Sequence, residues 1–486
     1  MHNGYFTWYI NKQFSAQERL ALFVSGETRL TWTSLLLNEL PDAQVYLVGG
    51  GVRDVLLGIN PEDLDIVISG VPATELESWL IRHGAVSRVE STFGTFKFAP
   101  HGLQKSRPID IALPRTERVG TTHNSGRKDL RIVSSHTTSI GEDLSRRDFT
   151  INAMAYNWQN GELIDPFYGQ SDLETGTIRT VLNPYDRFYE DATRMLRGLR
   201  FASQLGFAIE QKTWGAITEN LDILNNTVID EHGKYIYITP RSAIGKEFLL
   251  GFLAHPVHTL HTWEMSGALK LFLPEIEELK LMKSFKGQSA FENTKRILHL
   301  LKNSEFIERC GAKYASGNVL VAALCALCET PEKTASHLCT RLHLHQFPKG
   351  HLARVDMDTV PWLLCSLSFF ENHDPASMRP SHFEKMFATP RGTDLLLLAH
   401  AYYAQSGRHS VGRERVHVAT RLAASFKEQK NALARLVSGE DVRAFGVRPG
   451  PIYRELLDDV RDSQLAHKIH TRQEALVILQ KKVGEL

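Results

Sequence analysis

The stretch from Val45 to Val67 constrains the fold more than any other part of the chain, because it places apolar runs, glycines and acidic residues in one short unit (VYLVGGGVRDVLLGINPEDLDIV). The apolar run at 45–48 predicts a strand that ends at three glycines. Residues 52–57 predict one or two helical turns that stop at Gly58. A second strand follows, so the chain is expected to begin with an α/β unit.

The three glycines at 49–51 let the backbone come close to a ligand, because no Cβ stands in the way. A glycine turn that enters a helix leaves N–H groups that can face phosphate oxygens, and Arg53 adds a fixed positive charge. A plain turn is the alternative for this triplet taken alone.

Two carboxylates follow at Asp63 and Asp65, on either side of Leu64. Alternate side chains of a strand share a face, so both carboxylates are expected to point one way. Carboxylates held together without a basic residue between them need a proton or a cation, and Mg²⁺ binds carboxylate and phosphate oxygens. Asp110 lies between two isoleucines in the same pattern and is a candidate third carboxylate, with an exposed strand residue as the equal alternative. A solvated strand edge is the alternative for the pair, but its combination with the glycine turn favours nucleoside triphosphate chemistry.

The bulk composition is that of an ordinary soluble globular protein. The chain has 486 residues, 42% of them hydrophobic, and a formal net charge of +1, so nucleic-acid binding must depend on local patches. No stretch resembles a transmembrane segment or a signal peptide. Five cysteines, an odd number, favour a reducing cytoplasm over a disulfide framework.

Before the α/β unit, residues 15–23 and 30–40 are predicted to be helices that pack against the first sheet. Residues 115–140 are polar and rich in Gly, Ser and Thr, which predicts a mobile loop. Its basic residues can contact RNA or triphosphate, or only keep the loop solvated; they are Arg115, Arg118, Arg127, Lys128 and Arg131.

A second dense motif occupies residues 141–157 (GEDLSRRDFTINAMAYN). Arg146 and Arg147 adjoin Asp148 there. Such a pattern is often a surface ion pair of small value. Beside a triphosphate, however, arginine can hold phosphate and the aspartate can accept a ribose hydroxyl.

Residues 187–205 carry leucines and alanine at helical spacing and predict one helix, capped by Gly206. Asp191 and Arg194 are three apart and are expected on one face. Arg197 and Arg200 continue in steps of three and drift around the helix, so that Arg200 is the weakest candidate. A solvated, salt-bridged helix face is the alternative.

Residues 208–436 are predicted to be mostly helical and carry little distinctive chemistry. Cys325 and Cys328 lie in an apolar helical run, so these two and Cys339 are predicted to be buried structural cysteines rather than zinc ligands. Near the end of the chain, residues 446–451 (GVRPGP) predict a turn into a helix, where free amides and Arg448 can hold an RNA phosphate. A plain helix–turn–helix junction is nearly as probable on the sequence alone.

These motifs together resemble the tRNA nucleotidyltransferase and poly(A) polymerase family. The resemblance is strong over roughly residues 41–275, returns from Leu436 to the end and is loose between them. It is carried by GGGVRD at 49–54, DLD at 63–65, RRDFTINAMA at 146–155, DPFYG at 165–169 and EDATRMLRGLRFASQLGF at 190–207.

The resemblance implies an α+β fold: a nucleotidyltransferase head with a small mixed sheet, followed by all-helical neck, body and tail domains. The expected boundaries are 1–183, 184–275, 276–400 and 401–486, with the neck binding the nucleotide base and RNA and the tail binding tRNA. The compact Arg–Glu motif of the family's neck fits residues 239–248 only with a shifted spacing, in which Glu247 corresponds and Arg241 does not.

Carried over by the resemblance, Asp63 and Asp65 bind Mg²⁺. Asp110 is a further catalytic candidate on its strand pattern alone. Gly50, Arg53 and Arg147 hold the triphosphate and Asp148 holds the ribose. The residues that read the base are Asp191 and Arg194, assisted by Arg197, with Arg200 as the weaker candidate.

The chemistry of the bases supports this assignment independently. Cytosine and adenine each present an amino donor beside a ring-nitrogen acceptor, whereas guanine and uracil present the reverse order. Asp191 only accepts and Arg194 only donates, so this pair fits C and A. A wrong base would leave buried groups unpaired, at about 1–3 kcal/mol per group.

The sequence therefore predicts an enzyme that adds CCA to the 3′ end of tRNA from CTP and ATP in the cytoplasm. Poly(A) addition and partial CC or A addition are alternatives within the same chemistry. A non-catalytic RNA-binding protein is the alternative from another class, and the presence of every key carboxylate and arginine argues against it.

Overall fold

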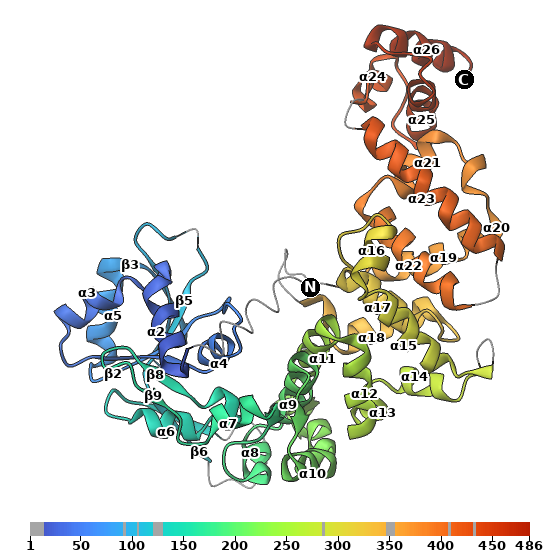
Figure 1. Cartoon of the computed structure of the whole chain (residues 1–486). Helices are drawn as coiled ribbons and strands as arrows, with labels where there is room; N and C mark the ends of the chain where they lie inside the picture. The colour runs from blue at the N-terminus through green and yellow to red at the C-terminus, as the bar shows by residue number, and fades with distance from the viewer. Residues whose placement is uncertain are drawn as a thin grey trace. The chain divides into compact units, whose positions relative to one another are not determined.

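The computed structural model describes residues 14–90, 94–104, 106–119, 130–283, 287–346, 355–406, 410–430 and 434–486. The chain divides into two compact units, Met1–Glu247 and Phe248–Leu486. Figure 1 shows that the first unit contains a β-sheet with helices and the second unit is helical. The predicted α+β class is confirmed, whereas the finer division into head, neck, body and tail stays a prediction.

The first unit is organised around a mixed sheet with the strand order β3-β4-β5-β2-β1-β8-β9. β2 and β5 are parallel, and the other neighbouring pairs are antiparallel. The strands are β1 (Gln44–Val48), β2 (Asp65–Ser69), β3 (Gly84–Glu90), β4 (Thr95–Pro100), β5 (Ile109–Ala112), β8 (Ala155–Asn157) and β9 (Leu163–Ile164). The short helix α4 (Gly50–Leu56) follows β1, as the sequence predicts.

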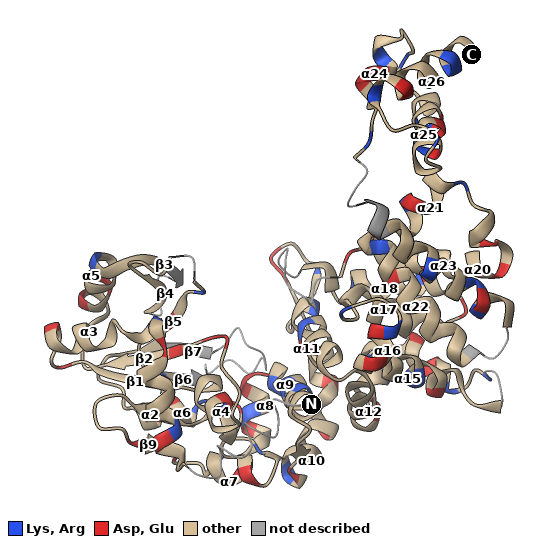
Figure 2. Ribbon diagram, turned by 45° about the horizontal axis from the view of Figure 1, so that its top comes forward, with Lys and Arg blue, Asp and Glu red and all other residues tan. Residues whose placement is uncertain are grey.

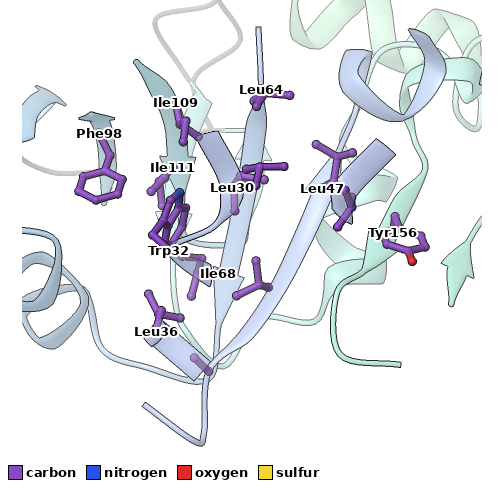
Figure 3. Close-up of a cluster of buried hydrophobic side chains, with 14 of the residues drawn as sticks. Leu30, Trp32, Leu36, Leu47, Leu64, Ile68, Phe98, Ile109, Ile111 and Tyr156 are labelled. Carbon is purple, nitrogen blue, oxygen red and sulfur yellow. The ribbon is translucent and has the colours of Figure 1, made fainter. Parts of the chain in front are cut away.

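One face of this sheet packs on the main hydrophobic core of the unit, part of which is drawn in Figure 3. Four helices and one 3₁₀ turn among the described residues contribute to that core: α2 (Ala16–Gly26), η1 (Thr28–Leu30), α3 (Thr33–Glu39), α4 and α5 (Ala73–His83). The predicted packing of the N-terminal helices against the sheet is confirmed. Leu64 and Ile66 point into this core, and so do Ile109 and Ile111 of β5.

The opposite face of the sheet carries the alternate residues of the same strands. Val67 of β2 joins a second apolar cluster there, together with Leu144 of α6 (Ile140–Ser145). Because side chains alternate along a strand, Asp65 lies on the face of Val67, and Asp110 lies opposite Ile109 and Ile111. The packing of the core thus places Asp65 and Asp110 on the face of the sheet that points away from the core.

The described ends of the predicted 115–140 loop, residues 115–119 and 130–134, are strands instead. The structure has an antiparallel pair there, β6 (Arg115–Val119) and β7 (Leu130–Ser134), followed by the start of α6. The backbone pairing overrides a composition rich in polar residues, because a two-stranded ribbon satisfies its own hydrogen bonds without a buried face. The candidates Arg127 and Lys128 lie outside the described residues.

The single helix predicted over 187–205 is two helices, α8 (Pro184–Glu190) and α9 (Thr193–Leu205). Asp191 has an extended backbone, with φ −145° and ψ 100°, and ends α8. Its side chain accepts hydrogen bonds from the backbone N–H and the hydroxyl of Thr193, the first residue of α9. The helical spacing continues across this break, which is why the pattern alone does not reveal it.

The remaining elements of the first unit are short. They are η3 (Thr150–Asn152), α7 (Gly169–Glu174), β10 (Thr177–Ile178), β11 (Ala208–Ile209), α10 (Gln211–Asn220), η4 (Leu221–Asn225), β12 (Thr227–Ile229), β13 (Tyr235–Tyr237) and the start of α11 (Arg241–Ala254).

The second unit is built of helices joined by turns. In its first part these are α12 (Pro256–Ser266), α13 (Ala268–Phe272), α14 (Pro274–Glu277), η5 (Glu278–Lys280), α15 (Ala290–Leu300), α16 (Ser304–Arg309), α17 (Gly317–Cys325), α18 (Pro331–Arg341) and η7 (Leu344–Gln346). They continue with α19 (Thr359–Leu367), α20 (Phe369–Asn372), η8 (Pro375–Ser377), α21 (Pro380–Phe387), α22 (Pro390–Ser406), α23 (Ser410–Lys430), α24 (Gly439–Ala444), α25 (Pro451–Leu465) and α26 (Arg472–Gly484). No helix among the described residues is long and apolar enough to span a membrane.

Two predictions for the second unit are confirmed. Cys325, Cys328 and Cys339 are buried. The GVRPGP segment turns into α25, with Pro451 in the first helical turn.

Candidate active site in the first unit

The predicted carboxylates gather on the sheet face away from the main core. Asp65 is the register partner of Asp110 on the parallel strands β2 and β5, and Asp63 precedes β2. Burial raises the pKa of Asp65; nearby Arg147 opposes that rise, and Asp110 and Asp63 reinforce it. The three carboxylates are therefore close enough to repel one another.

Cations from outside the DLD motif already contact two of these carboxylates. Arg107 lies 3.1 Å from Asp63, and Lys97 of β4 lies 2.6 Å from Asp110. No basic residue lies between Asp63 and Asp65 in the sequence, but the fold brings one to Asp63 and one to Asp110. Lys97 faces Asp110 through the register of β4 on β5.

The donor set suits a hard divalent cation, because Asp65 is a partly buried carboxylate whose pKa is raised and a cation would reverse that effect. Among the described residues, no three carboxylate, imidazole or thiol side chains converge as ready metal ligands. The contacts of Asp63 and Asp110 with Arg107 and Lys97 are consistent with that finding, since these cations hold two of the three side chains.

The glycine turn lies beside the arginines of the second motif. Gly49 has φ +68°, and a Cβ on it would come within 2.5 Å of Nη1 of Arg147. A larger residue at this position would be strained and would also displace the guanidinium. Nε of Arg147 is buried and has no hydrogen-bond partner among the described residues, which leaves a donor for an anion at this turn.

Asp143 fixes both arginines of the RRD motif, a role that the sequence reasoning missed. Its side chain is fully buried and lies 2.7 Å from Arg146 and 3.0 Å from Arg147. Burial alone would raise the pKa of Asp143, but the two arginines and their hydrogen bonds lower it. The i,i+3 and i,i+4 spacing from Asp143 was visible in the sequence, although the burial that makes it strong was not.

Asp148 is the centre of a hydrogen-bond network that joins the two predicted motifs. Oδ2 accepts from Nε of Arg197 at 2.7 Å, and Oδ1 accepts from the amide of Asn152 at 3.2 Å. Oδ1 of Asn152 in turn accepts from Arg53 at 2.8 Å. Burial opposes ionisation of Asp148, yet Arg197 and these hydrogen bonds hold its pKa at about 2. The network thus links the phosphate candidate Arg53 to helix α9.

The two residues predicted to read the base lie at the break between α8 and α9. Asp191 contacts Thr193, as described above, and Arg194 is buried and lies 2.8 Å from Glu190. Arg194 also donates to the carbonyl of Arg146 at 3.0 Å, so it touches the RRD motif. Glu190 holds Arg187 as well, at 2.6 Å. Asp191 and Arg194 therefore both lie at the break between α8 and α9, but their side chains have different contacts: Thr193 for Asp191, and Glu190 for Arg194.

Arg200 packs into the interior and away from the sheet carboxylates. Its Nε donates to Glu247, the neck glutamate singled out by the sequence, and its guanidinium lies 4.0 Å from the ring centroid of Phe201. Arg53 and Arg197 lie over the same ring at 5.2 and 5.4 Å. The ring of the buried Phe201 thus contacts three arginines through cation–π interactions. The apolar spacing of α9 predicted only that Phe201 is a core residue. Figure 2 marks the basic residues of α9 in blue.

Arg241 donates to Asn225 at 2.7 Å, and its guanidinium lies 3.5 Å from the ring centroid of Tyr237. The correspondence of Glu247 with the neck motif stays a prediction.

The first unit thus combines paired carboxylates on a small mixed sheet with a glycine turn and fixed arginines. Residues 45–179 match the model of the poly A polymerase head domain, which confirms the family resemblance for this part of the chain.

Curated relatives carry a more particular name. The chain is 41% identical over 187 residues to a CCA-adding enzyme of Enterococcus faecalis, which covers 38% of this chain and 43% of that relative. A CCA-adding enzyme of Lactiplantibacillus plantarum is 41% identical over 189 residues, with 38% and 42% covered. The matched stretch thus spans less than half of the length of these relatives.

The fold is similar over nearly the whole chain. The Bacillus stearothermophilus CCA-adding enzyme in complex with CTP has a TM-score of 0.58 at 22% identity, covering 97% of this chain and 98% of that chain. The Thermotoga maritima CCA-adding enzyme complexed with tRNA has a TM-score of 0.54 at 20% identity, covering 95% and 98%. The described chain therefore has the fold of CCA-adding enzymes.

Proposed function

We propose that this chain is a template-independent RNA nucleotidyltransferase that adds CCA to the 3′ end of tRNA from CTP and ATP. The observation that carries the proposal is the registered carboxylate pair, Asp65 and Asp110, beside the arginines of the glycine turn. Head-domain relatives named CCA-adding enzyme support it, as does the fold shared with CCA-adding enzymes solved with CTP and with tRNA.

In this proposal Asp63 and Asp65 bind Mg²⁺, and Asp110 supports them from the neighbouring strand. When bound, Mg²⁺ would neutralise developing charge and favour the ionised form of an attacking 3′-hydroxyl. Before Mg²⁺ binds, Lys97 pairs with Asp110 and Arg107 pairs with Asp63, which offsets the repulsion among the three carboxylates.

The triphosphate is held by the glycine turn and the arginines around it. Gly50 offers backbone N–H, and Arg53 and Arg147 offer charged donors. Asp143 keeps the guanidinium of Arg147 against the turn, so it is oriented before the nucleotide binds. The 3′-hydroxyl of tRNA then attacks the α-phosphorus and pyrophosphate leaves, with most of the catalysis coming from positioning and electrostatics.

Base choice is assigned to Asp191 and Arg194, with Arg197 assisting and Arg200 as the weaker candidate. Glu190 and the carbonyl of Arg146 fix the guanidinium of Arg194. A fixed donor beside an acceptor discriminates C and A from G and U, because a mismatched base cannot satisfy both groups.

The remaining parts of the proposal follow the resemblance. Residues 1–183 form the catalytic head, 184–275 a neck that binds the base and RNA, 276–400 the body, and 401–486 a tail that binds tRNA. The cytoplasm is the proposed location.

The test uses purified protein with Mg²⁺ and three RNAs: tRNA lacking its 3′ end, tRNA ending in CC, and an unstructured oligonucleotide. Each receives CTP, ATP or both, and products are resolved at single-nucleotide length. The proposal predicts addition of C, C and A to the first tRNA, A to the second, and then a stop. Long A tails on any RNA would indicate a poly(A) polymerase, a halt after CC or growth only from CC would indicate a partial enzyme, and binding without product would indicate a non-catalytic protein.

A further inference from the structure

The hydrogen-bonding capacity of the Asp148 carboxylate is already filled. An ionised carboxylate offers about four lone-pair sites. Oδ1 accepts from the backbone N–H of Phe149 at 2.8 Å and from the amide of Asn152 at 3.2 Å. Oδ2 accepts from Nε of Arg197 at 2.7 Å, and a second nitrogen of the same guanidinium lies 2.5 Å away. A ribose hydroxyl can donate to this carboxylate only if one of these donors leaves.

The donors differ in how readily they can move. The N–H of Phe149 belongs to the backbone, and the Asn152 side chain is buried and tied to Arg53 at its other end. Arg197 comes from a separate element, helix α9, and its side chain is 36% exposed, against 6% for Asp148. Arg197 is therefore the partner that can be exchanged.

We propose that Arg197 occupies the ribose acceptor of Asp148 and that the 2′-hydroxyl of the incoming nucleotide binds by taking its place, which makes Arg197 a determinant of sugar selectivity. The inference rests on the proposed function and on the expectation, carried over by the family resemblance, that Asp148 holds the ribose. The 2′-hydroxyl is the relevant one for sugar selectivity, because it is the group that distinguishes a ribonucleotide from a 2′-deoxynucleotide.

The released guanidinium has acceptors within electrostatic reach. Asp191 and Glu247 both interact favourably with the charge of Arg197 in the present structure. A shift of Arg197 away from Asp148 would therefore bring positive charge toward Asp191, a residue assigned to base reading. Recognition of the sugar and recognition of the base become one coupled event.

This exchange has a consequence for selectivity that a fixed ion pair does not have. A 2′-deoxynucleotide leaves the Asp148–Arg197 pair intact, whereas a ribonucleotide must displace it. With Arg197 present, the ratio of ribonucleotide to deoxyribonucleotide use is therefore lower than it would be if Asp148 had no arginine partner. Without Arg197, a deoxynucleotide would leave Oδ2 of Asp148 unpaired and would bind less well relative to a ribonucleotide.

The experiment compares CTP with 2′-deoxyCTP in wild-type protein, Arg197→Met and Asp148→Asn. Arg197→Met is expected to raise the ratio of the two kcat/KM values about tenfold, and Asp148→Asn to bring it toward one. Arg197→Lys, which keeps the charge but fewer donors, is expected to fall between wild type and Arg197→Met and replaces it if Arg197→Met does not fold. An unchanged or lower ratio in the Arg197 variants would overturn the proposal.

The matched control is Arg179→Met. Arg179 pairs with the buried Asp172 at 3.1 Å, so its removal also leaves a buried acid of the first unit without its arginine. The other side-chain partner of Asp172 is Thr150, so the carboxylate of Asp148 keeps all of its own donors in this control. The sugar ratio is expected to stay at the wild-type value. An equal rise in this control would show a general effect of losing an arginine and would overturn the proposal.

The test remains separable from the proposed function. If the wild-type protein adds no nucleotide to any tRNA, the same ratio is measured by calorimetric binding of CTP and 2′-deoxyCTP. A rise in the ratio of dissociation constants in Arg197→Met would then support the exchange even though tRNA is not extended. An unchanged ratio would overturn it.

Discussion

Among the described residues, two of the buried pairs of an acid and an arginine look alike and differ in their surroundings. In the first unit, Asp148 pairs with Arg197 of α9. In the second unit, Glu384 of α21 pairs with Arg461 of α25 through two short contacts, 3.0 and 2.6 Å. Both acids are almost fully enclosed, but the side chain of Arg461 is 6% exposed and that of Arg197 is 36% exposed.

The surroundings indicate what each pair does. Arg461 also donates to Gln464, and the same two helices are joined at their rim by Arg379, which contacts Asp459 and Asp462. That pair therefore fixes how α21 packs on α25. The pair in the first unit leads instead through Asn152 to Arg53 and the glycine turn. We therefore interpret the Glu384–Arg461 pair, whose contacts all lie between packed helices, as structural. We interpret the Asp148–Arg197 pair as part of the proposed binding site, because its hydrogen bonds connect to the glycine turn, where Nε of Arg147 is a donor without a partner.

The largest expected effect is on the carboxylate face. Asp63→Ala and Asp65→Ala are each expected to lower nucleotide addition by about 10³-fold or more, because each removes a proposed metal ligand. The rate of single-nucleotide addition to tRNA measures this, with circular dichroism as the check of folding. Substantial residual activity in a folded variant would contradict the assignment.

The structural pair gives the largest expected effect on stability. Glu384→Ala leaves Arg461 buried and unpaired and is expected to cost about 3–5 kcal/mol. Replacing both partners with apolar residues, Glu384→Leu with Arg461→Met, should be close to neutral. Urea midpoints of the two variants measure the difference. Equal losses in both would show that packing, and not the unpaired charge, is responsible.

The Asp148 pair predicts a pH dependence at the acid end. The pKa of Asp148 falls from an ordinary 3.8 to about 2 in the folded protein, so its ionised form stabilises the fold. That contribution, about 2 kcal/mol, is complete above pH 4 and is lost as pH falls toward 2. The melting temperatures of wild type and Asp148→Asn should therefore converge between pH 4 and 2. A constant difference over that range would contradict the shift.

The smallest expected effect concerns the thiols, all five of which lie in the second unit. Burial raises the pKa of Cys310 to about 11 and those of Cys328 and Cys339 to about 12, and it raises that of Cys325 as well. Cys365 alone is exposed. A thiol reagent at pH 8 should modify Cys365 first and the others only after unfolding. Fast modification of several thiols in the native protein would contradict the burial of the other four cysteines.

The parts of the site that follow a local period could be predicted from the sequence. Alternation along β2 and β5 placed Asp65 and Asp110 on one face, and the glycine turn pointed to α4. The partners that arrive from other strands could not be predicted. Lys97 faces Asp110 only through the pairing of β4 with β5, which no local pattern encodes.

The helical region shows the same limit. The spacing of α9 indicated its apolar face, but not that the chain breaks at Asp191 or that Asp148 would take up Arg197. The break depends on one extended residue, and the ion pair depends on the docking of α9 on the RRD motif. Both are tertiary effects that override a periodic signal.

The most direct test of the distinction between site charge and structural charge measures nucleotide addition and melting temperature together in Asp65→Asn and Glu384→Gln. Burial and neighbouring carboxylates raise the pKa of Asp65, so its ionised form destabilises the fold at neutral pH and its neutralisation should not lower the melting temperature. We expect Asp65→Asn to lose addition of C and A to tRNA while its melting temperature is unchanged or higher. Glu384→Gln should melt earlier while the protein that remains folded keeps adding nucleotides. Retained addition in Asp65→Asn, or its loss in fully folded Glu384→Gln, would contradict this account.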